Sequence, residues 1–140
     1  MDQIYFAALK LLKTRDHTVA SLRQKLEEKF GGVPEEVFEQ LLKRNFLNDR
    51  RFAENYVSRR KDRAQAALRE DLIARGVATD IVDETLSKAD LPSLREAMAA
   101  KIEDWKLRVP LQPRDAARLF RALLRLGYDE DAIREEIENS

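Results

Sequence analysis

The sequence of 140 residues has no cysteine, a single histidine, four glycines and four prolines. Without cysteine there is neither a disulfide framework nor a thiolate metal site, which fits a reducing compartment, so we expect a cytoplasmic protein. No stretch approaches the ~18 consecutive apolar residues of a membrane span. The amino terminus also lacks the basic start and apolar run of a signal peptide. These absences argue against a membrane protein and against a secreted disulfide scaffold.

Residues that usually carry catalysis are sparse as well. His17 has no cysteine or second histidine to share a metal with, and we interpret it as a turn residue that packs locally. Gly31 and Gly32 follow a predicted helix, whereas a phosphate-binding loop opens a helix after a strand. Most carboxylates lie at predicted helix starts or on polar faces, where capping and solvation account for them. We therefore expect no catalytic residue, no metal, no cofactor and no enzymatic activity.

The sequence does contain a block of about 23 residues that occurs three times. Each copy has two leucines four residues apart, then a glycine, then apolar residues five, six and ten positions after that glycine. Steps of 44 and 51 residues separate the glycines (76 − 32 and 127 − 76), which is typical of repeat arrays. The copies are Leu22, Leu26, Gly32, Val37, Phe38, Leu42; Leu68, Leu72, Gly76, Ile81, Val82, Leu86; and Leu119, Leu123, Gly127, Ala132, Ile133, Ile137.

Helical periodicity dominates the chain, and we find no strand-like alternation. Thr18, Asp49 and Thr79 are predicted N-caps, and glycine is predicted to end the middle helix of each copy. The sequence thus predicts an all-α fold of three tandem three-helix, helix-turn-helix-like repeats at residues 1–47, 48–91 and 92–140. The nine predicted helices lie at about residues 4–13, 18–30, 34–44, 50–61, 64–75, 79–87, 93–107, 114–126 and 129–138.

Charge is balanced overall, 26 basic residues against 26 acidic ones, but not locally. Residues 106–125 carry a net charge of +5, residues 126–140 carry −5, and residues 50–63 carry +4. Within the first of these segments, helical spacing places four arginines on one stripe, opposite the apolar Ala116, Leu119, Phe120, Leu123 and Leu124. The four are Arg114, Arg118, Arg121 and Arg125.

Two interpretations of this arginine stripe remain open. Four guanidinium groups in a row can bind phosphates or an acidic protein surface through bidentate contacts. Equally, a charged stripe is the ordinary solvated face of an amphipathic helix. A second candidate patch, Arg59, Arg60, Lys61 and Arg63, is weaker, because it straddles a predicted helix end where cations are favoured anyway.

Aromatic side chains offer possible stacking surfaces for bases, but packing explains most of them. Phe52 and Phe120 fall on apolar helix faces, so we predict that they are core residues. Tyr128 follows a cap glycine and is predicted to pack back on its own helix. Ile102, Trp105 and Val109 lie near one face, which is a candidate seam between repeats.

Residues 46–57, with the sequence FLNDRRFAENYV, resemble the signature of the RecX family, the bacterial modulators of the RecA recombinase. Three further stretches agree with the family in the same order: residues 8–12 leading to 17–18 and 22–26, residues 68–76, and residues 119–137. The chain departs from the family at Ser21, where a glutamate often completes a capping box. It departs again at residues 62–66, where a turn with glycine and proline is usual.

The resemblance implies an elongated, curved array of repeats, and separately from it we expect a monomer. It would bind the RecA filament on single-stranded DNA and suppress ATP hydrolysis, strand exchange and co-protease activity, thereby regulating recombination and DNA repair. Some members of the family also contact DNA directly, so weak direct binding to DNA is expected too. The alternative is an autonomous DNA-binding helical-repeat protein. Zero net charge argues against that alternative, because phosphate contacts dominate the affinity of such proteins.

Overall fold

The structure, a computed structural model, describes residues 2–140, which form nine helices and no strand. The all-α prediction is therefore confirmed. The helices are α1 Asp2–Thr14, α2 Val19–Phe30, α3 Glu35–Lys43, α4 Asp49–Ser58, α5 Gln65–Ala74, α6 Thr79–Lys88, α7 Leu94–Asp104, α8 Pro113–Arg125 and α9 Glu130–Glu138. No helix among residues 2–140 is long and apolar enough to cross a membrane. The interpretation of the amino terminus falls partly on Met1, outside the described residues.

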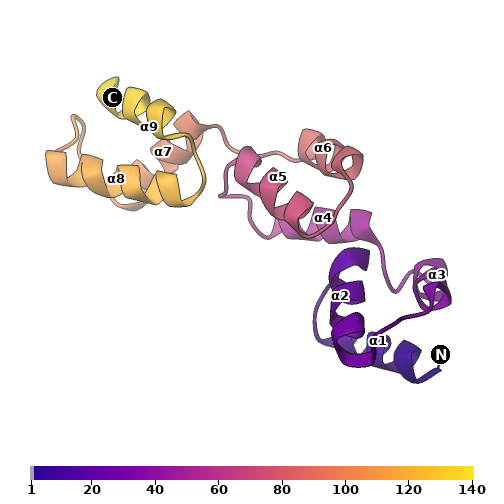
Figure 1. Cartoon of the computed structure of the whole chain (residues 1–140). Helices are drawn as coiled ribbons and strands as arrows, with labels where there is room; N and C mark the ends of the chain where they lie inside the picture. Colours follow the sequence, from indigo (N-terminus) through magenta and orange to yellow (C-terminus); the bar gives the residue numbers. More distant parts are fainter. Residues whose placement is uncertain (1) are drawn as a thin grey trace.

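The helices form three triplets in an extended row, with the two chain ends at opposite ends of the molecule (Figure 1). We call α1–α3, α4–α6 and α7–α9 the first, second and third repeats, and their exact boundaries at residues 47/48 and 91/92 stay a prediction. Each triplet has its own hydrophobic core, and the two repeat leucines of the middle helix are at its centre: Leu22 and Leu26, Leu68 and Leu72, Leu119 and Leu123. These six leucines are 0–1% exposed.

Helix caps follow the predictions in part. Thr18 caps α2 as predicted, and Ser21 completes a capping box with it, so a serine does here what glutamate does in the family. The predicted cap at Asp49 is wrong. Asn48 is the N-cap, since its side chain accepts a hydrogen bond from the Arg51 amide, and α4 begins at Asp49. Thr79 is not a cap either, since Ala78 holds that position and α6 begins at Thr79.

The first repeat deviates from the other two after its middle helix. Gly31, with a φ of 77°, ends α2, rather than the Gly32 of the sequence alignment. In α3 the core position falls on Leu41, which is fully buried, while Leu42 is 46% exposed. Leu41 follows Gly31 by ten residues, as Leu86 follows Gly76, so alignment of the repeats on Gly31 instead of Gly32 explains why Leu42 points outward.

The seams place the end of one middle helix against the start of the preceding one. Gly76 follows α5 at a φ of 86°, and a Cβ there would overlap the Cβ of Ala20 in α2. Gly127 follows α8 at a φ of 97°, and a Cβ there would lie 2.5 Å from the Cβ of Ala67 in α5. Glycine is required at each seam position for two reasons: the φ is positive, and the neighbouring alanine leaves no room for a Cβ.

Hydrogen bonds complete both seams. The Thr18 hydroxyl donates to the Arg75 carbonyl oxygen at 2.6 Å, and the Val19 amide donates to Asp49 Oδ1 at 2.9 Å. At the other seam the Ala64 amide donates to the Leu126 carbonyl oxygen at 2.9 Å. The candidate seam at Trp105 is thus wrong: Trp105 packs on the core of the third repeat, and Val109 is 60% exposed.

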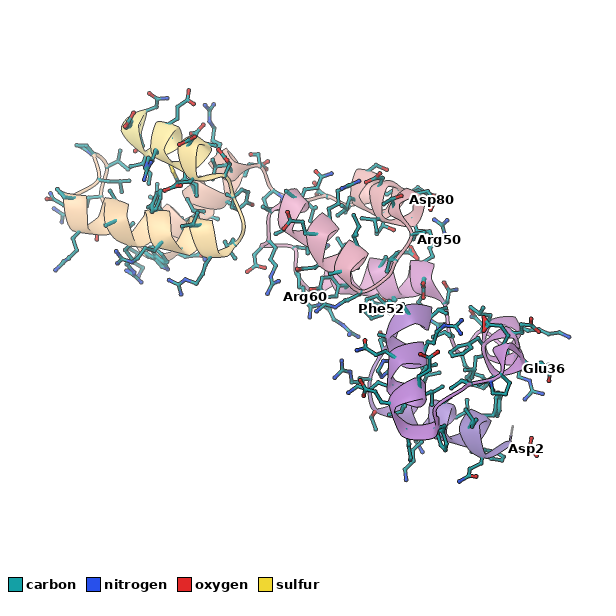
Figure 2. The ribbon with its side chains drawn as sticks, viewed as in Figure 1. Asp2, Glu36, Arg50, Phe52, Arg60 and Asp80 are labelled. Carbon is teal, nitrogen blue, oxygen red and sulfur yellow. The ribbon has the colours of Figure 1, made fainter. Side chains whose placement is uncertain are left out.

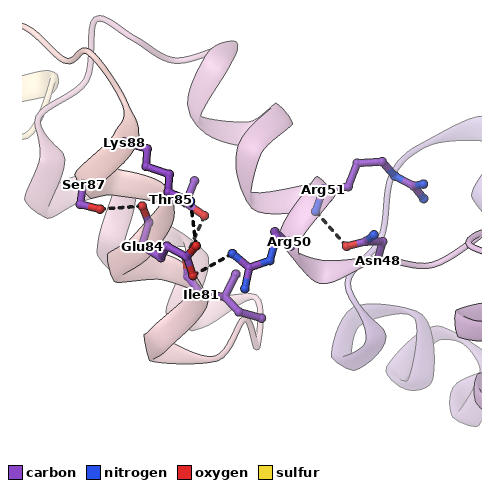
Figure 3. Close-up of polar contacts among 8 residues, drawn as sticks. All are labelled: Asn48, Arg50, Arg51, Ile81, Glu84, Thr85, Ser87 and Lys88. Carbon is purple, nitrogen blue, oxygen red and sulfur yellow. Dashed lines mark hydrogen bonds and ion pairs between the residues drawn. The ribbon is translucent and has the colours of Figure 1, made fainter.

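Within the second repeat, an ion-pair bridge joins the first and last helices (Figure 3). Glu84 of α6 accepts from Lys88 Nζ at 2.8 Å and from Arg50 Nη1 of α4 at 2.9 Å. These two cations, Lys88 first, hold the pKa of Glu84 at about 2. The bridge lies at the surface and supplements the apolar contact between α4 and α6, which contributes most of the stability.

Candidate functional site: a cationic groove on the third repeat

The arginine stripe lies on α8, as the periodicity predicts. Gln112 precedes the helix, and Pro113 occupies its first position, where a missing amide proton does no harm. Leu119 and Leu123 are fully buried and fix the orientation of the helix, whereas Leu124, predicted to be buried, is 44% exposed. All four arginines of the stripe are exposed, and none forms an ion pair within residues 2–140: Arg114, Arg118, Arg121 and Arg125.

Lys101 of α7, which the sequence interpretation missed, and Trp105 at the end of that helix, which it placed at a seam, lie beside the stripe. The Arg118 guanidinium lies 3.8 Å from the centre of the Trp105 ring, and Lys101 Nζ lies 5.6 Å from it. Together the two helices enclose a groove of about 400 Å³, lined by Lys101, Trp105, Arg118, Arg121, Ala122, Arg125 and Leu126. Arg114 lies one turn away and does not line it.

This third-repeat groove combines four cations with an aromatic ring and contains no carboxylate. Guanidinium groups bind carboxylates and phosphates through two parallel hydrogen bonds, and Trp105 holds one of them in place by a cation–π contact. Uncompensated positive charge in a concave surface attracts anionic partners and speeds their association. The groove therefore suits an anionic partner, and its chemistry fits either a phosphate chain or a carboxylate-rich protein surface.

The second candidate patch is divided by the fold. Because α4 ends at Ser58, the four residues of this patch lie in the turn that follows the helix. Arg60 stacks at 3.8 Å on the Tyr56 ring, and Arg63 pairs with Asp71 at 3.1 Å. Among the described residues, Arg59 and Lys61 form neither an ion pair nor a cation–π contact. The charge run therefore overstates how much positive charge is free for a partner.

The Asp71 carboxylate, which pairs with Arg63, also holds Tyr56 in place. The Tyr56 hydroxyl donates to Asp71 at 2.9 Å, and burial followed by this hydrogen bond raises the pKa of Tyr56. Arg75 lies 4.7 Å from the same ring. In Figure 2, Arg60 and Phe52 lie along one edge of the second repeat, away from Asp80. The polar residues on this edge thus serve mainly to hold one another.

Arg59 nevertheless contributes to a smaller hollow where the first two repeats meet. This hollow of about 240 Å³ includes Arg15 from the first repeat and Arg75 from the second, neither of which the sequence interpretation singled out. Asp16 lies beside them and offsets part of the charge. Compared with the third-repeat groove, this hollow is smaller and its charge is partly compensated.

His17 is buried, with Nδ1 3.1 Å from the Ser21 hydroxyl. Burial, and secondarily the nearby Arg15, lowers its pKa. This geometry agrees with the interpretation of His17 as a locally packed turn residue. Among residues 2–140, no group of three or more histidine, cysteine, aspartate or glutamate side chains is arranged to hold a metal ion.

Comparison with known proteins identifies close relatives. The second three-helix domain of RecX matches residues 48–86. The regulatory protein RecX of Halorhodospira halophila is 36% identical over 132 residues, covering 91% of this chain and 82% of the relative. The regulatory protein RecX of Trichlorobacter lovleyi is 34% identical over 144 residues, covering 96% and 93%. That of Leptothrix cholodnii is 32% identical over 134 residues, covering 91% and 83%.

Proposed function

The chain belongs to the RecX family of regulatory proteins, and on that premise we propose that it is a negative modulator of RecA. It would bind the RecA filament on single-stranded DNA and suppress ATP hydrolysis, strand exchange and co-protease activity, without being an enzyme itself. The extended row supports a clamp across neighbouring RecA subunits that obstructs rearrangement or growth of the filament. The RecA filament is its proposed partner, the protein acts as a monomer in the cytoplasm, and no cofactor takes part.

The observation that carries the proposal beyond family membership is the third-repeat groove. Arg118, Arg121 and Arg125 remain unpaired beside Trp105, in a chain whose net charge is zero. In a protein with as many acids as bases, leaving these cations uncompensated favours a dedicated anionic partner over general solubility. We propose that this groove is one anchor on the filament, with Arg114 at its margin and Arg59 and Lys61 as outlying contacts.

The test is RecA's ATP hydrolysis on single-stranded DNA as the protein is titrated in, with filament co-sedimentation alongside. We expect ATP hydrolysis to fall and the protein to appear in the pellet. Loss well below one molecule per RecA subunit indicates capping of filament ends, and loss only near saturation indicates binding along the lattice. Unchanged hydrolysis without co-sedimentation would contradict the proposal.

The groove has its own variant, Arg118→Glu/Arg121→Glu. Because like charges would then face the partner's anions, we expect about tenfold more protein to be needed for half-inhibition. The matched control is Lys106→Glu/Arg108→Glu, which changes the net charge equally at two exposed residues of the same repeat outside the groove. Circular dichroism verifies that both variants are folded. Equal inhibition by both variants would rule the groove out as an anchor.

Direct binding to DNA is the second candidate function, favoured by the Trp105 ring beside the guanidinium groups. Contacts to about four phosphates of a single strand would give a log–log salt slope near −2.8. Tight binding to bare single strands with that slope, and no preference for the RecA filament, would favour the autonomous DNA-binding protein instead.

A further inference from the structure

A second groove lies at the other end of the row, between α1 and α2. It encloses about 400 Å³ and is lined by Ala7, Lys10, Leu11, Thr14, Lys25 and Lys29. Like the third-repeat groove, it is formed by the first and middle helices of its repeat. We call it the lysine groove. We propose that it is a docking site for an acidic, amphipathic segment of the partner protein.

Charge is the first argument. Three ammonium groups line the lysine groove, no carboxylate does, and none of the three forms an ion pair within residues 2–140. Lys25 and Lys29 are four residues apart on α2, where like charges repel and destabilise a helix. Lys10 of α1 adds a third positive charge from across the groove. An anionic partner relieves this repulsion.

The groove floor decides between kinds of anion. Half-buried Ala7 and Leu11 provide an apolar floor, and the aliphatic stems of the lysines extend it. An amphipathic segment can place apolar side chains on such a floor and carboxylates at the ammonium rim. A nucleic acid strand would leave the floor uncovered, and the groove has no aromatic ring or arginine for stacking, unlike the groove with Trp105. The observations therefore favour a protein segment.

The second repeat explains why the lysine groove is not simply a by-product of the fold. Aligning the buried leucines of the middle helices places Lys25, Asp71 and Ala122 at the same position, one residue before Leu26, Leu72 and Leu123. In the second repeat this position is an acid, Asp71, and its charge is balanced by an ion pair with Arg63. The two end repeats instead leave it cationic or open. Neither end repeat therefore has a carboxylate at this position of its middle helix.

This inference rests on the proposed function, because the segment would belong to RecA. The first test is zero-length carbodiimide cross-linking of the wild-type protein to RecA filaments, which joins a lysine amine directly to a carboxylate in contact with it. We expect peptides that link Lys10, Lys25 or Lys29 to RecA aspartates or glutamates. Lys43, exposed on α3 of the same repeat, serves as the internal control.

The second test compares Lys25→Glu with Lys43→Glu, each of which reverses one exposed lysine of the first repeat. We expect Lys25→Glu to weaken co-sedimentation with the filament about tenfold and Lys43→Glu to leave it unchanged. If the wild-type protein binds the filament but both variants bind equally well, the inference about the lysine groove is overturned and the proposed function stands. The same holds if the wild-type protein binds but none of the three groove lysines is cross-linked. A Lys25→Glu defect that is equally large on bare single-stranded DNA would also overturn it, in favour of phosphate binding. Failure of the wild-type protein to bind the filament would overturn the proposed function as well.

Discussion

The second and third repeats use the same architecture for different purposes. The second repeat lies between two seams, and two of its acids have partners inside the protein: Asp49 accepts from the Val19 amide of α2, and Asp71 accepts from Arg63 and Tyr56 of its own repeat. The third repeat has a seam on one side only, and the cations of its groove have no carboxylate partner within the described residues. In the repeat that joins two neighbours, these charged side chains bind other groups of the protein. In the terminal repeat, the cations of the groove remain available for a partner.

The largest expected effect comes from breaking the seam of the second repeat with Gly76→Ala. The new methyl group must adopt a positive φ and displace Ala20, so we expect a loss of ~2–4 kcal/mol in the free energy of unfolding. Gly31→Ala is the comparison without a close approach: nothing lies within 4 Å of the added atom, so only the backbone cost at a φ of 77° and a ψ of −121°, ~1–3 kcal/mol, should be lost. Urea unfolding followed by circular dichroism measures both.

The double variant Gly76→Ala/Ala20→Gly separates the two costs. Removing the Ala20 methyl group restores the space but not the backbone conformation, so part of the lost stability should return. If Gly76→Ala/Ala20→Gly were no more stable than Gly76→Ala, the close approach at the seam would contribute nothing.

A smaller effect is expected from giving the third repeat the carboxylate that the second repeat has. Ala122→Asp places an acid in the third-repeat groove at the position of Asp71, where it can pair with the groove's arginines. We expect affinity for the RecA filament to fall about tenfold, or ~1.4 kcal/mol, at low salt. Co-sedimentation across salt concentrations measures it, and Ala100→Asp, exposed on α7 outside the groove, is the control. Equal affinities of the two variants would remove the charge distinction between the repeats.

The smallest effect concerns pH and the Glu84 bridge of the second repeat. The pKa of Glu84 is about 2 in the folded protein and near 4.5 when unperturbed. The bridge therefore stabilises the fold above pH 4.5, and this contribution is lost as the pH falls towards 2. Glu84→Gln should reduce the acid dependence of the urea midpoint between these values, whereas Glu28→Gln, an exposed carboxylate on α2 with no ion pair within residues 2–140, should not. An unchanged acid dependence in Glu84→Gln would show that the bridge is not coupled to folding.

Periodicity was sufficient to predict the helices and the arginine stripe, because both depend on neighbours three or four residues apart, whereas the predicted caps at Asp49 and Thr79 each fell one residue too late. Predictions failed where a side chain acts on another element. Asp49 reads as a cap from its sequence position, yet it accepts from Val19, thirty residues away. Arg63 counts as free charge in a sequence window, although Asp71 pairs with it.

Both grooves require two helices to be placed side by side, which explains why the sequence interpretation found only half of one and missed the other. Lys101 and Trp105 come from α7, and no spacing along the chain links them to the stripe on α8. A weak signal was present for the lysine groove, since Lys25 and Lys29 repeat at helical spacing. Lys10 joins them only through the packing of α1 on α2.

The seams give the molecule a direction. At each seam the carboxyl end of one middle helix, which carries a partial negative charge, meets the positive amino end of the preceding middle helix. The dipoles of α2, α5 and α8 therefore follow one another head to tail. The row therefore has two unlike ends, the lysine groove near one and the arginines near the other. Since a polymer of identical subunits is itself directional, such a rod can lie along it productively in only one orientation.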